Sequence, residues 1–182
     1  MAAGVEQRYA VRGLDRYDNE RDDDLTDRVD LSIDPVDPST AGAGSCTTSG
    51  CTATKTGDYR VTATVVGTKI SGRASLHVVP GPLDHLALDP GEATVGVDAR
   101  RPYRAEGADA YGNSLGDYAT RTDFSIKEPD GSCSQDGCGA TKAGDYTVIG
   151  RAIGTDVTGT ATGCWTWTSA AWSSPPGAST PT

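Results

Sequence analysis

Phenylalanine, methionine and histidine are scarce in this chain of 182 residues, which has one Phe, one Met and two His. No stretch approaches the ~20 consecutive apolar residues that a membrane-spanning helix requires, so we expect no membrane insertion. No stretch shows a convincing 3.6-residue apolar period, which argues against helices. Short alternating runs between turn residues, with 23 Gly and 10 Pro in the chain, indicate an all-β protein instead.

Basic residues are also few. The 16 Lys and Arg are outnumbered by 25 Asp and Glu, and the formal net charge is −9. Phosphate binding needs a basic face, so nucleic acid is an unsuitable partner, and an anionic membrane surface is equally unsuitable. An acidic surface of this kind mainly favours solubility.

The chain contains the same pattern twice, in what we call the first and second repeats. The matching segments are 9–19 and 103–113, 30–33 and 123–126, and 46–59 and 133–146. A catalytic site is rarely duplicated together with its turns, tyrosines and cysteine pair, whereas a structural module often is. The duplication therefore favours a modular binding or spacer protein over an enzyme.

The domain boundaries follow from this repetition. We predict a first module over 1–79, a short proline linker over 80–82, a second module over 83–164, and a divergent, disordered tail over 165–182. Only Met1 to Arg8 precede the repeated Tyr9, whereas the second module has a longer lead before Tyr103. We therefore expect the first module to lack its opening strand.

The second module reads as short strands separated by turns roughly every 8–12 residues, the pattern of an immunoglobulin-like β-sandwich. Alternating apolar positions are clearest over 83–88, 145–153 and 157–162. The predicted fold is thus all-β, with two tandem immunoglobulin-like β-sandwich modules. Tyr59 and Tyr146, each in a Gly-Asp-Tyr sequence, are predicted to form tyrosine corners, in which the hydroxyl bonds back to nearby backbone.

Four of the five cysteines form two close pairs at equivalent positions of the repeats, Cys46 with Cys51 and Cys133 with Cys138. No His or further Cys completes a metal-ligand set, and the four-residue spacing fits neither zinc nor thioredoxin patterns. Disulfides formed in an oxidising compartment are the preferred interpretation, with free thiols and a redox or metal role as alternatives. Cys164 has no counterpart.

The amino-terminal sequence Met-Ala-Ala-Gly lacks the basic start and apolar core of a secretory signal. Disulfides without an export signal form a contradiction. The simplest resolution is that the chain is a fragment of a longer exported protein, so we expect an extracellular or cell-surface location.

An acidic segment in the first repeat offers oxygen ligands for Ca²⁺, which prefers several oxygens from one loop. The weak candidates are Asp15, Asp18, Asn19 and Asp22. No Asp-x-Asp-x-Asp-Gly loop with a closing Glu is present, so a solvated acidic loop is the preferred interpretation. We expect no other cofactor.

The sequence offers few candidate catalytic residues. His77 and His85 have no motif around them, and no Gly-x-Ser-x-Gly nucleophile elbow is present, so we predict that the chain is not an enzyme. Trp165, Trp167 and Trp172 nearly alternate, which is compatible with a sugar-binding platform or a sticky edge, although a non-functional tail is the preferred interpretation.

The segment 105–113, Ala-x-Gly-x-Asp-x-Tyr-Gly-Asn, and the Thr-Lys-x-Gly-Asp-Tyr-x-Val runs at 54–61 and 141–148 resemble the bacterial immunoglobulin-like repeats of surface proteins and adhesins. That broad class includes invasin and intimin modules. The resemblance covers residues 9 to about 162, and the cysteine pairs depart from the usual invasin-type pattern. It implies an extracellular stalk or adhesion role without catalysis.

Neighbouring repeats of the parent chain are the implied partners, and a host protein or glycan is a further candidate. The alternative function is an accessory carbohydrate- or protein-binding module of an extracellular enzyme.

Overall fold

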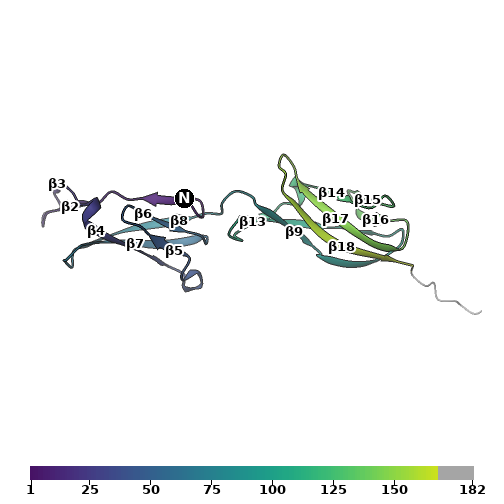
Figure 1. Ribbon diagram of the computed structural model, residues 1–182, viewed down its shortest axis with the longest axis horizontal. Helices are drawn as coiled ribbons and strands as arrows, with labels where there is room; N and C mark the ends of the chain where they lie inside the picture. Colours follow the sequence, from purple (N-terminus) through teal and green to yellow (C-terminus); the bar gives the residue numbers. More distant parts are fainter. Residues whose placement is uncertain (168–182) are drawn as a thin grey trace, which may run out of the picture. The chain divides into compact units, whose positions relative to one another are not determined.

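The computed structural model describes residues 1–167. This part of the chain consists of short β-strands and single-turn 3-10 helices, with no α-helix, which confirms the all-β prediction (Figure 1). No described helix is long and apolar enough to cross a membrane. The chain divides into two compact units. Unit 1 comprises residues 1–85 together with 107–116, and unit 2 comprises 86–106 and the described residues from 117 onward.

Unit 1 is built from two three-stranded antiparallel sheets and a hairpin, with 3-10 turns at Thr26–Arg28 and Pro38–Thr40. The first sheet is β4 (Val29–Pro35), β7 (Gly57–Val65) and β8 (Ser71–Val78), the second is β1 (Glu6–Arg8), β6 (Gly50–Ala53) and β5 (Gly44–Cys46), and the hairpin is β2 (Arg12–Leu14) with β3 (Glu20–Asp24). Buried residues from both sheets form a single core cluster that includes Ala53, Tyr59, Val61 and Val78. One core between two sheets is the defining feature of a sandwich.

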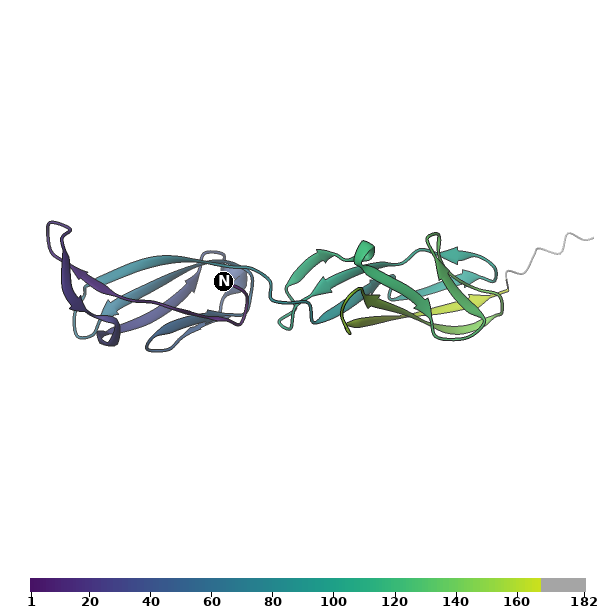
Figure 2. The same cartoon turned by 90° about the horizontal axis from the view of Figure 1, so that it is seen from above.

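Unit 2 repeats this plan. Its larger sheet has the order β10 (Glu92–Gly96), β18 (Thr158–Thr166), β17 (Gly144–Ala152) and β14 (Thr122–Ile126), and its smaller sheet has β11 (Arg100–Arg101), β16 (Gly137–Ala140) and β15 (Gly131–Ser134). Unit 2 also contains a 3-10 turn at Ala119–Arg121. A further sheet of the chain, which is not confined to the residues of unit 2, contains β9 (His85–Asp89), β12 (Arg104–Ala108) and β13 (Ser114–Asp117). The two cartoon views show that β4, β7 and β8 run side by side, as do β14, β17 and β18 (Figures 1 and 2).

The opening of the first repeat is shorter than that of the second. In unit 2, β10 pairs in parallel with β18 over five residues, from Glu92↔Thr162 to Gly96↔Thr166. In unit 1, the same place holds a single parallel bridge between Ala2 and Val79. The described part of unit 1 has no counterpart of β9.

The central strands show why these segments form sheets. In β17, the side chains of Tyr146, Val148 and Ala152 are buried, while Asp145 and Arg151 on the opposite face are exposed. Alternation with a period of two places one apolar row against the core, which fixes the register of the strand. β7 uses Tyr59 and Val61 in the same way.

The carboxyl-terminal strand continues beyond the predicted boundary at residue 164. β18 runs to Thr166, and Trp165, the first residue of the tail that the sequence predicts to be disordered, is fully buried. Its indole packs edge-on against Tyr146, with ring centroids 5.3 Å apart, and its Nε1–H donates to the Ala99 carbonyl at 3.3 Å. The predicted tail from residue 168, which includes Trp172, lies outside the described residues.

An exchange of side-chain volume explains why the two repeats stop matching in sequence at this point. Leu76 and Val78 fill the core of unit 1, and the equivalent positions in unit 2 are Gly163 and Trp165. A Cβ built on Gly163 would collide with the indole of Trp165, so the ring occupies the space above the glycine. Cores tolerate such paired changes when the total volume is kept.

We predict that Trp165→Val destabilises unit 2 by about 3 kcal/mol, because it leaves a cavity beside Tyr146. Gly163→Leu alone is also destabilising, because its side chain collides with the indole. The double variant, which copies unit 1, is expected to recover much of the lost stability. Urea unfolding of the four proteins gives the coupling energy, and a double variant no more stable than the sum of the single changes would contradict the exchange.

Candidate functional site

The loop between β2 and β3 and the loop between β12 and β13 carry the most distinctive polar side chains shared by the repeats. In the first-repeat loop, residues 15–19, Asp15 Oδ1 accepts hydrogen bonds from the N–H groups of Tyr17 at 2.8 Å and Asn19 at 3.0 Å. The Asn19 side-chain amide donates to Asp15 Oδ2 at 3.0 Å. Asp side chains bond readily to backbone a few residues ahead, so this loop is held by local chemistry.

The second-repeat loop, residues 109–113, has the same internal pattern. Asp109 Oδ1 accepts from the N–H groups of Tyr111 and Asn113, both at 2.9 Å, and the Asn113 amide donates to Asp109 Oδ2 at 2.8 Å. The fourth position has a left-handed backbone in both loops, with φ of 64° at Asp18 and 72° at Gly112. Both residue types accept that conformation.

The surroundings of the second-repeat loop differ from those of the first. It belongs to unit 1, where it packs on the first-repeat turn, residues 54–56. The Asn113 amide donates to the Thr54 carbonyl at 2.8 Å, and its Oδ1 accepts from Thr56 N–H at 3.1 Å. Lys55 Nζ donates to the Tyr111 carbonyl at 2.6 Å. Three hydrogen bonds, each between a side chain and a backbone group, therefore join the loop to the turn.

Two further contacts complete this arrangement within unit 1. The N–H of Gly81 donates to Asp109 Oδ2 at 2.7 Å. The Tyr111 ring lies so close to Gly4 that a Cβ at this glycine would collide with it. As a result, Asp109 is 1% exposed and Asn113 is 5% exposed.

The Asp109 carboxyl is held in its ionised form. Burial on its own would raise its pKa, but hydrogen bonds from the Asn113 side chain and from the N–H groups of Gly81, Asn113 and Tyr111 outweigh burial and lower the pKa to about 2. A buried carboxylate with several N–H donors behaves in this way because each donor stabilises the charge. The site is thus a structural anion position rather than a proton donor near neutral pH.

The first-repeat loop lacks such a covering surface in the described structure. Asn19 is exposed, Asp15 is half-buried, and the Tyr17 side chain is 67% exposed. Hydrogen bonds from the Asn19 side chain and from the N–H groups of Asn19 and Tyr17 lower the pKa of Asp15. The loop therefore keeps its shape without a partner.

The predicted calcium ligands are brought only partly together. The Asp15 carboxylate faces N–H donors from its own loop, and Asn19 donates to it. Asp18 lies in the same loop, whereas Asp22 lies in β3 and its side chain is outside the described part. Among the described side chains, no group of three His, Cys, Asp or Glu is placed to hold a metal ion.

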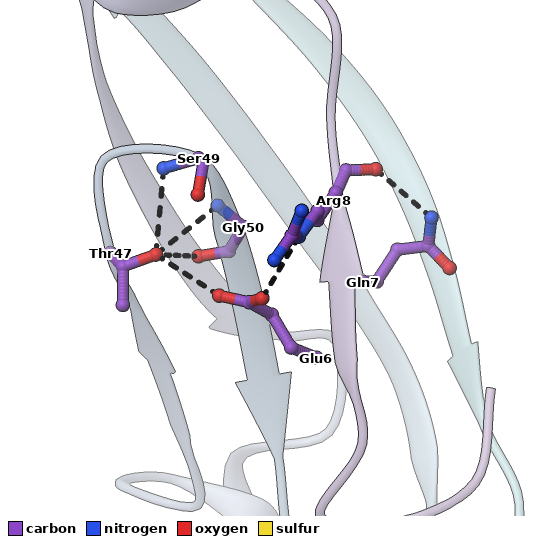
Figure 3. Close-up of polar contacts among 6 residues, drawn as sticks. All are labelled: Glu6, Gln7, Arg8, Thr47, Ser49 and Gly50. Carbon is purple, nitrogen blue, oxygen red and sulfur yellow. Dashed lines mark hydrogen bonds and ion pairs between the residues drawn. The ribbon is translucent and has the colours of Figure 1, made fainter.

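The cysteine pairs form two disulfides, Cys46–Cys51 and Cys133–Cys138, each joining directly opposed residues of a hairpin. Around the first disulfide, the Thr47 hydroxyl accepts from Gly50 N–H at 3.3 Å and lies 3.2 Å from Glu6 Oε1 (Figure 3). This contact ties the disulfide loop to β1, which pairs with β6. The pairs lie at turns, where they stiffen local structure.

Both Gly-Asp-Tyr tyrosines bond back to the backbone. Tyr59 Oη donates to the Lys55 carbonyl at 2.9 Å, and Tyr146 Oη donates to the Lys142 carbonyl at 3.0 Å. The bond spans four residues in both repeats and closes the turn that precedes β7 or β17. A different pair, Tyr9 and Tyr103, has buried hydroxyls with no hydrogen-bond partner among the described residues. Burial raises the pKa of both phenols.

The remaining candidates do not assemble into a site in the described structure. His77 and His85 are exposed and lie 2.7 Å and 3.4 Å from the carboxylates of Asp58 and Asp84. The hydrogen bond to Asp145 raises the pKa of the Cys164 thiol, which disfavours a reactive thiolate. Trp165 is in the core while Trp167 is 70% exposed, so these two indoles do not share one platform.

No signal in the sequence marks the first-repeat turn, Gly81 or Gly4 as partners of the second-repeat loop. The repeated Asp and Asn marked the loop itself, but as a metal candidate in the first repeat only. Thr54 is 59 residues from Asn113, and Gly4 lies still further from Tyr111 in the sequence, so no local spacing relates these partners to the loop.

No protein-family model matches this chain, and no curated protein matches it. Among solved structures, the surface layer protein SbsC, domains 1–6, is similar with 14% identity over 85% of this chain and a TM-score of 0.38. SbsC domains 5–6 give 18% identity over 92% of both chains and a TM-score of 0.33. Drosophila N-cadherin EC1–4 gives 11% identity over 82% of this chain, 43% of that chain, and a TM-score of 0.44. This chain covers 22% of the length of the SbsC domain 1–6 structure.

We predict that Tyr59→Phe and Tyr146→Phe each lower the free energy of unfolding by about 1 kcal/mol, because each leaves a turn carbonyl without its hydroxyl donor. Tyr9→Phe and Tyr103→Phe are matched controls, and they are expected to be neutral or stabilising because they remove unpartnered hydroxyls. Thermal unfolding of the wild type and the four variants measures the change in the free energy of unfolding for each substitution. Equal losses in all four would contradict the assignment of the corner bonds.

We also predict an acid-dependent role for Asp109. Its folded pKa of about 2 lies below the ordinary value of 3.8, so the carboxylate contributes its full stability above pH 3.8 and loses it as the pH falls through 2. Asp109→Asn is expected to cost roughly 2 kcal/mol at neutral pH, because hydrogen bonds to a charged group are lost.

The difference between wild type and Asp109→Asn should shrink as the pH is lowered toward 2, in urea unfolding followed by circular dichroism. Asp15→Asn is the matched control, since it changes the same position of the exposed loop, and its cost should be smaller. A wild-type advantage that stays constant from pH 7 to pH 2 would rule out this role for the charge.

Proposed function

We propose that this chain is a non-catalytic, structural or adhesive segment of tandem immunoglobulin-like repeats from a bacterial surface or secreted protein. The observation that carries the proposal is the construction of one module twice in a single chain. The strand pairings β4–β7–β8 and β14–β17–β18 correspond, as do the two hairpin disulfides. Repetition of a whole structural unit extends a chain or multiplies a surface, and it serves a single active site poorly.

The role of each repeated polar group supports a structural function. The tyrosine hydroxyls close turns, the cysteine pairs close hairpins, and the Asp-Asn loops bond to themselves. These devices hold strand ends in place in modules whose cores are small. The repeated features thus have structural explanations that need no substrate.

The disulfides support a location outside the reducing cytosol. Disulfides form and persist in secreted and cell-surface environments. One disulfide at the equivalent position of each repeat supports such an oxidising environment for both modules. We therefore propose an extracellular or surface location. The net charge of −9 is compatible with a solvated segment that binds neither nucleic acid nor anionic lipid.

The alternative function is an accessory carbohydrate- or protein-binding module of an extracellular enzyme. The observation in its favour is the exposure of single aromatic side chains, with Trp167 70% exposed and Tyr17 67% exposed. Exposed aromatics can stack on sugars or on a host protein. The flanking sequence of the parent gene separates the two functions, since further repeats favour a stalk and a hydrolase domain favours the accessory module.

We predict that antibodies raised against the purified chain label intact cells of the organism that makes it, or detect the protein in the culture medium. An antibody against a cytosolic protein is the control, and it should label cells only after permeabilisation. Labelling by the first antibody only after permeabilisation would overturn the surface assignment.

A further inference from the structure

We propose that the first-repeat loop, residues 15–19, docks onto the second-repeat turn, residues 141–143, of a second copy of this chain. Unit 1 already contains one such contact, between the second-repeat loop and the first-repeat turn. The first-repeat loop and the second-repeat turn take no part in that contact, and together they would form a second contact of the same kind. The proposal deepens the proposed function, on which its biological meaning rests, because it names the partner of the repeats.

The loop half is formed in advance. Asp15 and Asn19 make the same hydrogen bonds to each other as Asp109 and Asn113 do, and both loops have a left-handed residue at the fourth position. In the docked loop, this arrangement directs the Asn amide toward the turn. A preformed loop loses little conformational entropy on binding, which favours association.

The turn half has the same backbone frame in both units. Tyr146 Oη donates to the Lys142 carbonyl, as Tyr59 Oη does to the Lys55 carbonyl. Thr141 N–H donates to the Asp130 carbonyl at 3.1 Å, where Thr54 N–H donates to Ala43 at 2.9 Å. The second-repeat turn therefore holds Lys142 and the peptide groups on either side of it in the same arrangement as the first-repeat turn holds Lys55.

Exposure distinguishes the two turns and the two loops. Thr54 and Thr56 are half-buried in unit 1, whereas the equivalent Thr141 and Ala143 are exposed. Asn113 is 5% exposed, whereas the equivalent Asn19 is exposed. Each surface that is covered in unit 1 has an uncovered counterpart with the same chemistry.

The equivalent contacts between two copies can be named. The Asn19 amide would donate to the Thr141 carbonyl and its Oδ1 would accept from Ala143 N–H, as Asn113 does with Thr54 and Thr56. Lys142 would leave its exposed ion pair with Asp130, where the N–O distance is 3.1 Å, and donate to the Tyr17 carbonyl. Exposed ion pairs contribute little, so this exchange costs little.

One position opposes the contact. Asp98 in unit 2 corresponds to Gly4, and both have a left-handed backbone, with φ of 66° and 77°. Tyr111 packs where a Cβ on Gly4 would lie, so the Asp98 side chain obstructs Tyr17 of an incoming copy. Asp98→Gly removes this obstruction at a backbone position that favours glycine, so it is expected to strengthen docking.

The contact between copies is weak in solution. In unit 1 the loop and turn belong to one chain, which gives them a high effective concentration that separate molecules lack. Because the two surfaces lie on different repeats, the contact is heterologous and builds open chains of copies rather than a closed dimer. A covalent trapping experiment is therefore more informative than an affinity measurement.

The experiment uses the full chain with a photoreactive residue in the loop, Tyr17→p-benzoylphenylalanine, mixed with an isotopically labelled copy and illuminated. We expect cross-links between copies that map to residues 141–145 or Asp98. A matched probe at Ile70, which is 69% exposed compared with 67% for Tyr17, measures random collision. Peptide mapping by mass spectrometry identifies both ends of each cross-link.

Two variants sharpen the result. Asn19→Ala in the probe-bearing copy should lower the yield of mapped cross-links at least fivefold, because it removes two hydrogen bonds to the turn and each is worth about a fivefold change. Asp98→Gly in the labelled copy should raise the yield. A Tyr17 probe no more efficient than the Ile70 probe, cross-links that map elsewhere, or yields unchanged by both variants would overturn the proposal. The surface location is tested separately on cells, so failure here leaves that result intact.

Discussion

The hydrogen bond from a tyrosine hydroxyl to the lysine carbonyl four residues earlier is the interaction on which the other contacts depend. It closes the turn before the central strand in both repeats, through Tyr59 with Lys55 and Tyr146 with Lys142. The ring of each tyrosine is buried in the core while its hydroxyl reaches the turn. One side chain therefore fixes the position of the strand and the shape of the turn at its end.

The first-repeat turn then holds the second-repeat loop within unit 1. Asn113 bonds to the peptide groups on either side of Lys55, and the charge of the buried Asp109 carboxylate is stabilised by N–H donors instead of a cation. N–H donors aimed at a carboxylate stabilise its ionised form and also fix its position. The loop is consequently a polar connector in a protein with few large apolar side chains.

The two repeats reach the same fold with different core residues. Gly163 and Trp165 replace Leu76 and Val78, and the indole takes the volume that the leucine fills in the first repeat. The similarity in sequence ends here although β18 continues to Thr166. The match between the two repeats therefore predicts an end of the second module at residue 164, before the end of β18. Residue identity is lost at this point, whereas packing conserves total volume.

The sequence by itself determined the all-β class and the division into two repeats, because period-two alternation and turn residues are local signals. It also placed the paired cysteines and tyrosines at equivalent positions, where the structure joins them to close neighbours. Only the tertiary structure decided that Trp165 is a core residue and that Asp109 and Asn113 pack on Thr54 and Thr56. Those outcomes depend on side chains that meet across large sequence separations, which local patterns do not encode.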